Sequence, residues 1–293
     1  MAARPQTLPA AAAPVIVGTG LAVRDGVFAT VPAVAALVGA ALIQVGTNFA
    51  NDYYDAIKGT DTDEREGFTR VTQSGLIPPS RVKLATAVTF ALSMVVGLYL
   101  VYVGGVPILV VGLASVVSGV AYTGGPYPLG YYGLGDLFVF VFFGLVAVTG
   151  TYYVQAVTHV ATAVPTTVPP ARAVIASLPI GALTTNILVV NNVRDLETDS
   201  KAGKRTLAVR FGYRFSRAQY LGLLALAYAT PLSLFAAGFD PTVLLPLATL
   251  PYAAVVTKTV LTRTDGAALN PALERTGKVL AAFAVLFAAG MVV

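Results

Sequence analysis

Long apolar segments recur along almost the whole of this chain, and they leave few folds open to it. Roughly 20 apolar residues are needed to cross the hydrocarbon core of a membrane. Nine segments reach that length: residues 10–31, 32–54, 82–103, 105–123, 135–157, 172–192, 216–237, 241–262 and 273–293. The sequence therefore predicts an all-α membrane protein, a bundle of nine transmembrane helices that forms a single domain.

The composition excludes several classes of protein. Of the 293 residues, 56% are hydrophobic and 11% are charged, whereas soluble domains carry about 25% charged residues. The chain has no cysteine, so disulfides and thiolate metal sites are excluded, and any metal must be a hard ion bound by oxygen. The net charge of +5 does not indicate a nucleic-acid partner, because the basic residues lie in loops beside apolar segments.

The placement of lysine and arginine predicts the orientation of the bundle. Except for Arg24 and Arg172, every Lys and Arg lies near the start of the chain or in and beside the loops after even-numbered segments. Cytoplasmic loops are enriched in these residues, so we expect the N-terminus in the cytoplasm and the C-terminus outside the cell membrane. The long loops 58–81, 124–134 and 195–215 then lie on the cytoplasmic side.

Acidic residues are concentrated at the ends of two apolar segments. Nine of the 14 acidic residues lie in or just after the runs 48–55 and 191–199. In a chain that otherwise avoids charge, acidic clusters at the edge of membrane-length segments indicate a functional site. The simplest interpretation is a divalent metal that holds a phosphorylated substrate at the membrane surface.

The spacing within each run favours a metal site over helix caps. Residues three and four apart share a helix face, which gives two polar stripes: Asn48, Asn51 or Asp52, and Asp55 in the first, and Asn191, Asp195 and Asp199 in the second. If the two helix ends face each other, the carboxylates repel unless a cation neutralises them. Mg²⁺ suits such a site, because one or two carboxylates hold it while waters and phosphates complete its shell. Two Mg²⁺ ions bridged by a diphosphate would neutralise both partners.

Not every acidic residue fits this interpretation. Helix caps and solvated helix ends commonly carry Asp, and we prefer that role for Asp63, Glu64 and Glu66. For Asp55, Asp195 and Asp199 we prefer the metal, because a cap does not require acids repeated along one face. Asp61, which follows a turn at 58–60, lies between the two cases.

Basic residues alternate with the acids in both runs and predict a site for an anion. They are Lys58, Arg65 and Arg70 after the first run, and Arg194, Lys201, Lys204 and Arg205 in and after the second. Each can equally be an ordinary loop charge of a cytoplasmic face. The run 199–206 is better suited to clamping a phosphate, and Gly59 and Gly203 would permit tight turns around it.

Motifs along nearly the whole chain resemble those of one family. They lie at residues 3–10, 51–61, 73–76, 122–130, 133–136, 191–199 and 203–210, and include Asn-Asp-Tyr-Tyr-Asp from Asn51 and Asn-Asn-Val-Arg-Asp from Asn191. Together they are similar to the UbiA-type intramembrane aromatic prenyltransferases, and within them to the branch that acts on 1,4-dihydroxy-2-naphthoate in menaquinone synthesis. In the wider family the first motif ends on an Asp at the place of Gly59; here Asp61 follows two residues later.

The resemblance implies a fold and a set of site residues. It implies a nine-helix bundle with a central cavity that opens to lipid, and Mg²⁺ bound by Asn51, Asp55, Asp195 and Asp199, with Asp61 as a further candidate. It implies diphosphate contacts from Arg4, Arg70, Lys201 and Lys204, to which the spacing adds Lys58. Tyr122 would face the reacting carbon, and no basic residue is carried over to the stretch that holds Tyr131 and Tyr132.

The implied activity is the transfer of a polyprenyl group from a prenyl diphosphate to the naphthoate ring, with loss of the ring carboxylate. Other acceptors in the same family are 4-hydroxybenzoate, homogentisate and an archaeal glycerol-ether phosphate. A different class, an ion-coupled secondary transporter, also uses ionisable residues in the membrane. The clusters lie at segment ends rather than near the bilayer centre, which favours the prenyltransferase.

Two further expectations concern the helices themselves. Phe49, Tyr53 and Tyr122 are candidates to stabilise a carbocation through their ring faces, whereas we expect the run 138–143 to pack against lipid. The acidic clusters close the second and sixth segments. This spacing indicates two related four-helix halves, segments one to four and five to eight, followed by a ninth helix.

Overall fold

The computed structural model describes residues 3–59, 71–159 and 169–293, and the described residues are helical nearly throughout. The helices are α1 (Leu8–Arg24), α2 (Thr30–Lys58), α3 (Pro79–Ala121), α4 (Gly135–Val139), α5 (Ala147–Ala156), α6 (Ala171–Arg194), α7 (Leu196–Lys201), α8 (Leu207–Ala236), α9 (Leu250–Thr262) and α10 (Gly266–Val292). A π-helical segment, Phe140–Val146, joins α4 to α5. Short 3₁₀ helices occupy Pro5–Thr7, Leu129–Tyr132, Val157–His159 and Pro241–Thr249.

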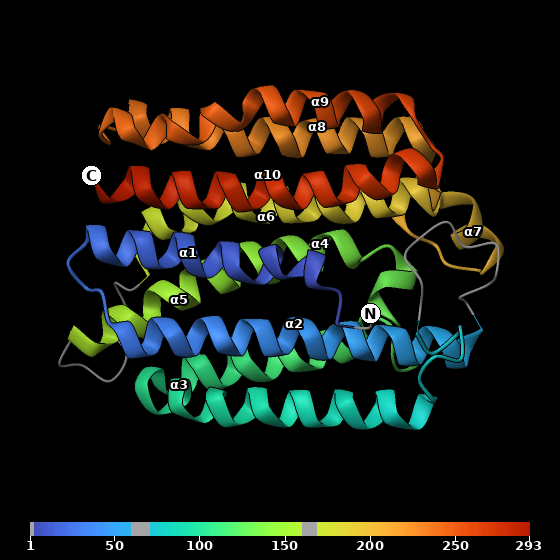
Figure 1. The fold of residues 1–293 in the computed structure, drawn as a ribbon. Helices are drawn as coiled ribbons and strands as arrows, with labels where there is room; N and C mark the ends of the chain where they lie inside the picture. Colours follow the sequence, from blue (N-terminus) through green and yellow to red (C-terminus); the bar gives the residue numbers. More distant parts are fainter. Residues whose placement is uncertain (1–2, 60–70, 160–168) are drawn as a thin grey trace.

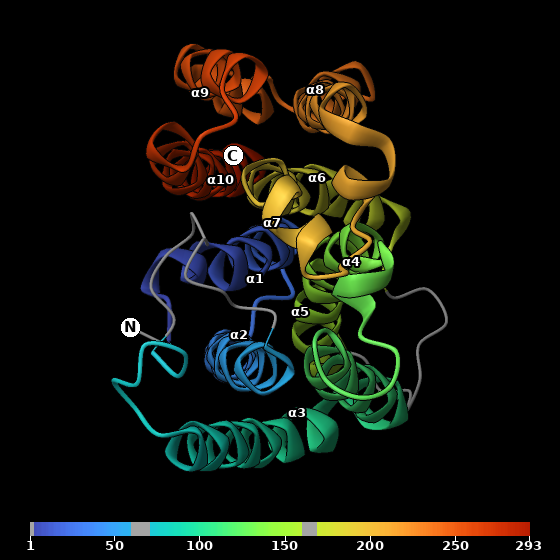
Figure 2. The same ribbon diagram turned by 90° about the vertical axis from the view of Figure 1, so that its right-hand side faces the viewer.

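Eight helical runs in the described residues are long and apolar enough to cross a membrane. The predicted segments 82–103 and 105–123 both fall within α3, whose backbone leaves the helical region at Gly105 (φ 68°, ψ −155°). A positive φ of this kind favours glycine, and Pro107 follows two residues later. Figures 1 and 2 show the two halves of α3 as separate helical stretches that change direction between them.

The long helices run along one direction, and their ends define two faces of the bundle (Figure 1). Seen end-on, α2 lies between α1, α3 and α5, while α8, α9 and α10 form the opposite side (Figure 2). The C-terminal ends of α2 and α6 and the short α7 lie at the same end of the bundle, at the right in Figure 1. We call this the acidic end, because it carries Asp55, Asp195 and Asp199.

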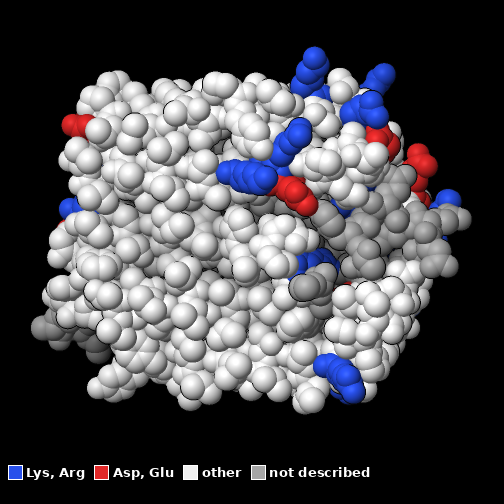
Figure 3. Space-filling view, viewed as in Figure 1, with Lys and Arg blue, Asp and Glu red and all other residues white. Residues whose placement is uncertain are grey.

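The helices differ in how much of their surface is buried. Helix α6 is the most buried of the eight runs and α3 the most exposed. The exposed face of α3 is apolar, with Leu84, Val95 and Leu98 among its exposed residues, as expected for a surface covered by lipid. Charged side chains in Figure 3 gather in the right-hand half of the view, and the left-hand half is uncharged except near its edge.

The helix boundaries at the acidic end place the two motifs. Helix α2 runs past Asp55 to Lys58 and ends at Gly59, which has the left-handed conformation (φ 65°) common at helix C-termini. The region 195–215, expected to be a loop, contains α7 and the start of α8, which bends at Gly212. Thr206 caps α8 by accepting a hydrogen bond from the backbone of Val209.

Candidate active site

One cavity of about 750 Å³ lies between α1, α2, α3, the segment from Leu129 to Ala156, and α6. Most residues predicted for the site line it: Arg4, Asn51, Asp55, Tyr122, Asp195, Asp199 and Lys204. The two acidic motifs, which are far apart in the sequence, therefore face a common space. Its remaining walls are mostly apolar and aromatic.

Asp55 is buried, with 2% of its surface exposed, and two groups from other segments hold its carboxylate. The Tyr131 hydroxyl donates a hydrogen bond of 2.6 Å to Asp55 Oδ1. The Lys204 ammonium lies 4.0 Å from the same oxygen and 3.4 Å from Asp199 Oδ1. The ring of Tyr131 also faces this ammonium at 5.0 Å. Carboxylates from two separate segments thus lie within reach of one cation.

Asp195 is held by its neighbour Arg194, which is buried among polar groups. The guanidinium donates to both carboxylate oxygens, from Nε to Oδ1 at 2.8 Å and from Nη2 to Oδ2 at 2.7 Å. It also donates to the side-chain oxygens of Asn191 at 2.7 Å and of Asn270, on α10, at 2.8 Å. Because a bidentate pair fixes direction as well as distance, Arg194 sets the position of the Asp195 carboxylate.

Of the two alternatives in the first polar stripe, Asn51 lines the cavity and Asp52 does not. Asn51 lines the cavity and accepts a hydrogen bond of 2.8 Å from the Thr123 hydroxyl. Asp52 is turned away from the cavity and accepts hydrogen bonds from the backbone N–H and the hydroxyl of Thr72. The second stripe is not one continuous helix, because the chain leaves helical geometry at Asp195 (φ −91°, ψ 7°). Asn191, Asp195 and Asp199 nevertheless all line the cavity.

Tyr122 is fixed in the cavity wall by two glycines. A Cβ atom at Gly130 would lie 2.9 Å from a carbon of the Tyr122 ring, and one at Gly135 would lie 2.8 Å from its hydroxyl. The backbone of Gly130 also donates to the Tyr122 carbonyl at 2.9 Å.

Two predicted residues, Lys58 and Lys201, do not line the cavity, and two more lie outside the described residues. The Lys58 ammonium donates to the backbone carbonyl of Thr123 at 2.6 Å, so it ties α2 to the segment after α3. Lys201 is exposed at the end of α7, and neither lysine lines the cavity. Asp61 and Arg70 lie outside the described residues.

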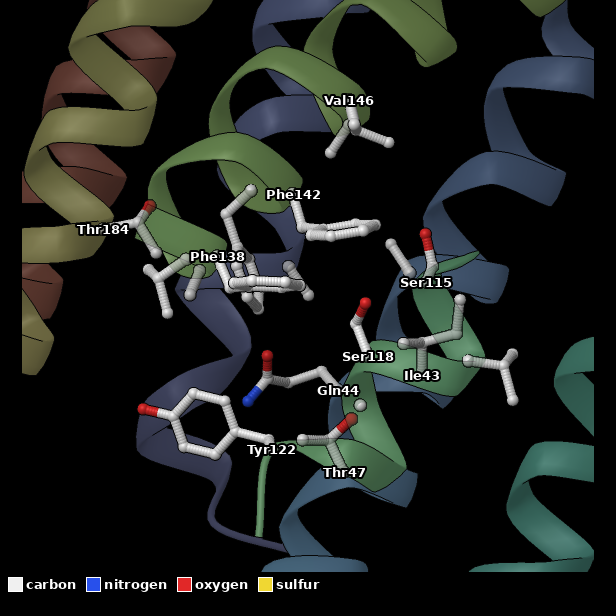
Figure 4. Close-up of a pocket in the computed structure, with 18 of the residues that line it drawn as sticks. Ile43, Gln44, Thr47, Ser115, Ser118, Tyr122, Phe138, Phe142, Val146 and Thr184 are labelled. Atoms are coloured by element: carbon white, nitrogen blue, oxygen red, sulfur yellow. The ribbon is translucent and has the colours of Figure 1, made fainter. Parts of the chain in front are cut away.

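The expectation that residues 138–143 face lipid is wrong. Phe138, Phe142 and Phe143 line the cavity, and Figure 4 shows Phe138 and Phe142 side by side in its wall. Their ring centroids are 5.9 Å apart, and the planes differ by 17°. Phe138 lies in α4, and Phe142 and Phe143 lie in the π-helical segment that follows it. The run 138–143 is apolar throughout, and an apolar run can line a cavity as readily as it can face lipid. Phe49 and Tyr53, which were candidates to stabilise a carbocation, do not line the cavity.

Two residues of the site were missed. Tyr131 lies in the stretch to which no basic residue was carried over, and its place between the motifs at 122–130 and 133–136 was the only available signal. Asn270 has no signal in the sequence, because its role depends on α10 packing against the end of α6.

The residues present fit a hard cation. Among the described residues, no three His, Asp or Glu side chains form a ready-made metal centre. Mg²⁺ does not require one, since one or two carboxylates with waters and phosphates complete its shell. Asp55 and Asp199 already lie within 4.0 Å of one ammonium, and Asn51, whose amide oxygen accepts from Thr123, lines the same cavity. Asp195, held by Arg194, lines the same cavity.

The chain belongs to the UbiA prenyltransferase family, whose model matches residues 11–276. This confirms the membership predicted from the motifs. Together with the eight apolar runs in the described residues, it identifies a multi-pass membrane protein.

Similar proteins cover nearly the full chain. The 1,4-dihydroxy-2-naphthoate octaprenyltransferases of Mycobacterium tuberculosis and Escherichia coli are each 39% identical to it, over 99% and 98% of this chain and 94% and 92% of their own lengths. A solved UbiA homologue from Archaeoglobus fulgidus, bound to GPP and Mg²⁺, has a TM-score of 0.64 and 19% identity. That match covers 99% of this chain and 98% of the homologue. At this identity, the structure shows a shared fold.

The buried pair Arg194–Asp195 gives the first testable prediction. Replacing Arg194 by Met leaves a buried carboxylate without its cation, which costs about 3–5 kcal/mol. We expect Arg194→Met to lower the free energy of unfolding by that order, measured by denaturant unfolding in detergent micelles. The double variant Arg194→Met/Asp195→Asn should recover a large share of the loss.

Arg214→Met is the matched control, because Arg214 is exposed on α8. It should leave the free energy of unfolding nearly unchanged. An Arg194→Met protein as stable as this control would contradict the assignment of Arg194 as the group that neutralises Asp195.

Proposed function

We propose that this protein transfers a polyprenyl group from a prenyl diphosphate to 1,4-dihydroxy-2-naphthoate, in a reaction that depends on Mg²⁺. The observation that carries the proposal is the cavity, whose wall holds carboxylates, amides and a lysine together with many apolar and aromatic side chains. A substrate with a charged head and a long apolar tail matches that combination. The naphthoate acceptor is supported by the two relatives that match this chain from end to end.

The diphosphate belongs at the acidic end. We assign Asn51, Asp55, Asp195 and Asp199 as the residues that hold the metal, with two ions bridging the diphosphate and Asp61 as a further candidate. When bound, Mg²⁺ would neutralise the negative charge that develops on the leaving diphosphate. Arg4 and Lys204 in the cavity wall would contact its oxygens, and Lys58, Arg70 and Lys201 would add positive charge around them.

The chain's own residues prepare the site for this substrate. Tyr131 and Arg194 hold the Asp55 and Asp195 carboxylates in place before a ligand arrives, and such preorganisation reduces the cost of binding. The Lys204 ammonium, now between Asp55 and Asp199, can turn to the diphosphate once another cation takes over the carboxylates. The groups around the carboxylates would thus balance their charge in the free protein and help to bind the substrate.

The proposed reaction transfers the prenyl group through an allylic carbocation. The bond between the allylic carbon and oxygen breaks, and its electron pair leaves on the diphosphate. The rings of Tyr122, Phe138 and Phe142 exclude water and face the carbocation. The electron-rich naphthoate ring then forms the new carbon–carbon bond, and loss of its proton and of the carboxylate as CO₂ restores the aromatic ring with a proton in the carboxylate's place.

We further propose the topology that the positive charges predict. Helix α3 would cross the membrane twice, on either side of Gly105, which makes nine crossings with the N-terminus in the cytoplasm and the C-terminus outside. The acidic end then faces the cytoplasm at the cell membrane, where soluble precursors can enter. The chain would be one domain, in which α1 to α3 and α4 to α9 form the two four-crossing halves and α10 the ninth helix.

Acceptor identity can be tested directly. Purified protein in detergent, with geranylgeranyl diphosphate and Mg²⁺, should prenylate 1,4-dihydroxy-2-naphthoate and release CO₂ and diphosphate, as measured by mass spectrometry and phosphate release. 4-Hydroxybenzoate and homogentisate, supplied separately, should give little product. Absence of a prenylated naphthoate, with product from another ring, would replace the acceptor and keep the mechanism. Release of no diphosphate with any acceptor would favour the transporter class.

The metal assignment predicts different outcomes for two neighbouring acids on α2. Asp55→Asn should lower kcat by more than about a thousandfold, because the residue lies in the cavity wall. Asp52→Asn, matched in chemistry but hydrogen-bonded to Thr72 outside the cavity, should lower it far less. Wild-type activity should vanish with a chelator and return with Mg²⁺. Turnover that persists in the chelator would contradict the metal assignment.

A further inference from the structure

Two side chains that line the cavity, Gln44 and Thr184, each have a buried oxygen with no hydrogen-bond partner among the described residues. The Thr184 hydroxyl can donate as well as accept, whereas the Gln44 oxygen can only accept. Gln44, on α2, is 9% exposed and lines the cavity. No donor in the described part of the chain reaches its side-chain oxygen Oε1. Burying an acceptor without a donor is costly, and a native protein that retains one commonly binds water or a ligand there.

The hydrogen bonds of the neighbouring residues fix which way the Gln44 amide points. The single hydroxyl proton of Thr7 is donated to the Arg4 carbonyl at 2.9 Å. Thr7 Oγ1 can therefore only accept from Gln44 Nε2, at 3.1 Å, and from Asn48 Nδ2, at 2.9 Å. Asn48 Nδ2 also donates to the Ala3 carbonyl, so its oxygen is free to accept from Gln44 Nε2 at 3.4 Å. The amide nitrogen of Gln44 is thus held by this network, and the oxygen is left for the cavity.

Aromatic rings lie on both sides of the Gln44 amide. Figure 4 shows the Gln44 oxygen turned toward Phe138, with the Tyr122 ring on the other side of the amide. Gln44 precedes Asp55 on the same helix by three turns, about 16 Å along its axis. The position is therefore separated from the carboxylates that we assign to the diphosphate.

The chemistry of the substrates decides which of them can satisfy Gln44. A diphosphate offers oxygen acceptors and negative charge, and a polyprenyl chain offers no donor at all. A phenolic ring offers an O–H donor on a flat apolar body, which suits a pocket of Phe138, Phe142 and Tyr122. We propose that Gln44 Oε1 accepts a hydrogen bond from a ring hydroxyl of the aromatic acceptor and selects acceptors that carry a hydroxyl at that position. This inference rests on the proposed function.

A buried hydrogen-bond acceptor discriminates strongly against substrates that cannot donate to it. An acceptor that lacks the hydroxyl would leave the Gln44 oxygen buried and unpaired, and sites built around a substrate hydroxyl reject analogues without it. The bond would also draw electron density from the O–H bond toward the ring and so orient and enrich the nucleophile. Gln44 would therefore contribute to specificity through direct contact with the substrate.

The test compares dihydroxy and monohydroxy rings in wild-type and variant protein. The measured quantity is kcat/KM for 1,4-dihydroxy-2-naphthoate divided by kcat/KM for the monohydroxy naphthoate that lacks the bound hydroxyl. We expect Gln44→Met to reduce this ratio by about ten- to a hundredfold relative to wild type. Comparing ratios removes the different intrinsic reactivities of the rings. The KM for geranylgeranyl diphosphate should change less than twofold, which shows that the rest of the cavity is intact.

Gln155→Met provides the matched control. Gln155 is fully buried and, like Gln44, has an Oε1 without a partner among the described residues, but it lies outside the cavity wall. Its nitrogen donates to the Thr19 hydroxyl and to the Thr151 carbonyl. This variant should keep the wild-type ratio. A Gln44→Met enzyme that keeps that ratio as well would overturn the inference.

Equilibrium dialysis with wild-type protein provides a second measurement if Gln44→Met does not fold. One of the two monohydroxy naphthoates should bind about tenfold or more weakly than the dihydroxy ring, and equal binding of all three would overturn the inference. Failure of the wild type to prenylate any naphthoate would instead count against the proposed function, so the two failures can be told apart.

Discussion

Charge compensation at the edge of an apolar bundle is the constraint on which the rest of this structure depends. Asp55, Asp195 and Asp199 are all buried, and an uncompensated buried carboxylate is strongly destabilising. Each is matched by a cation from its own or another segment: Arg194 for Asp195, and Lys204 for the other two. These contacts, with Tyr131 and Asn270, connect α2, α6, α7 and α10 at one end of the bundle. The site and the closure of that end are therefore the same set of interactions.

The shape of the cavity comes from interruptions of regular helix. The chain leaves helical geometry at Gly105 within α3 and at Asp195 between α6 and α7, and it widens into a π-helix at Phe140–Val146. Two glycines also shape the cavity wall, because Gly130 and Gly135 leave space for the Tyr122 ring. Regular helices alone would pack their side chains into the centre of the bundle. Here the interruptions turn polar and aromatic side chains toward an open centre.

Much of this could be predicted from the sequence, because two strong signals were available. Apolar length predicts the membrane-spanning runs. Spacing along a helix predicts that Asn51 shares a face with Asp55 and that Asp195 shares a face with Asp199, and the family resemblance joins the two pairs. What failed depends on local geometry that periodicity does not encode. The run 138–143 is apolar throughout, so its composition suits lipid and a cavity wall alike. Tyr131, Asn270 and Gln44 acquire their roles from neighbours far away in the chain, and a single sequence gives no distance between them.

The central claim is that carboxylates from both acidic motifs hold a metal against the diphosphate of a prenyl substrate. The most direct measurement is electron paramagnetic resonance of Mn²⁺ added, in place of Mg²⁺, to the protein with an unreactive prenyl thiodiphosphate. The account predicts bound Mn²⁺ with hyperfine coupling to ³¹P, lost when Asp55 and Asp195 are both replaced by Ala. Coupling that is absent from the wild type, or unchanged in that double variant, would contradict the claim.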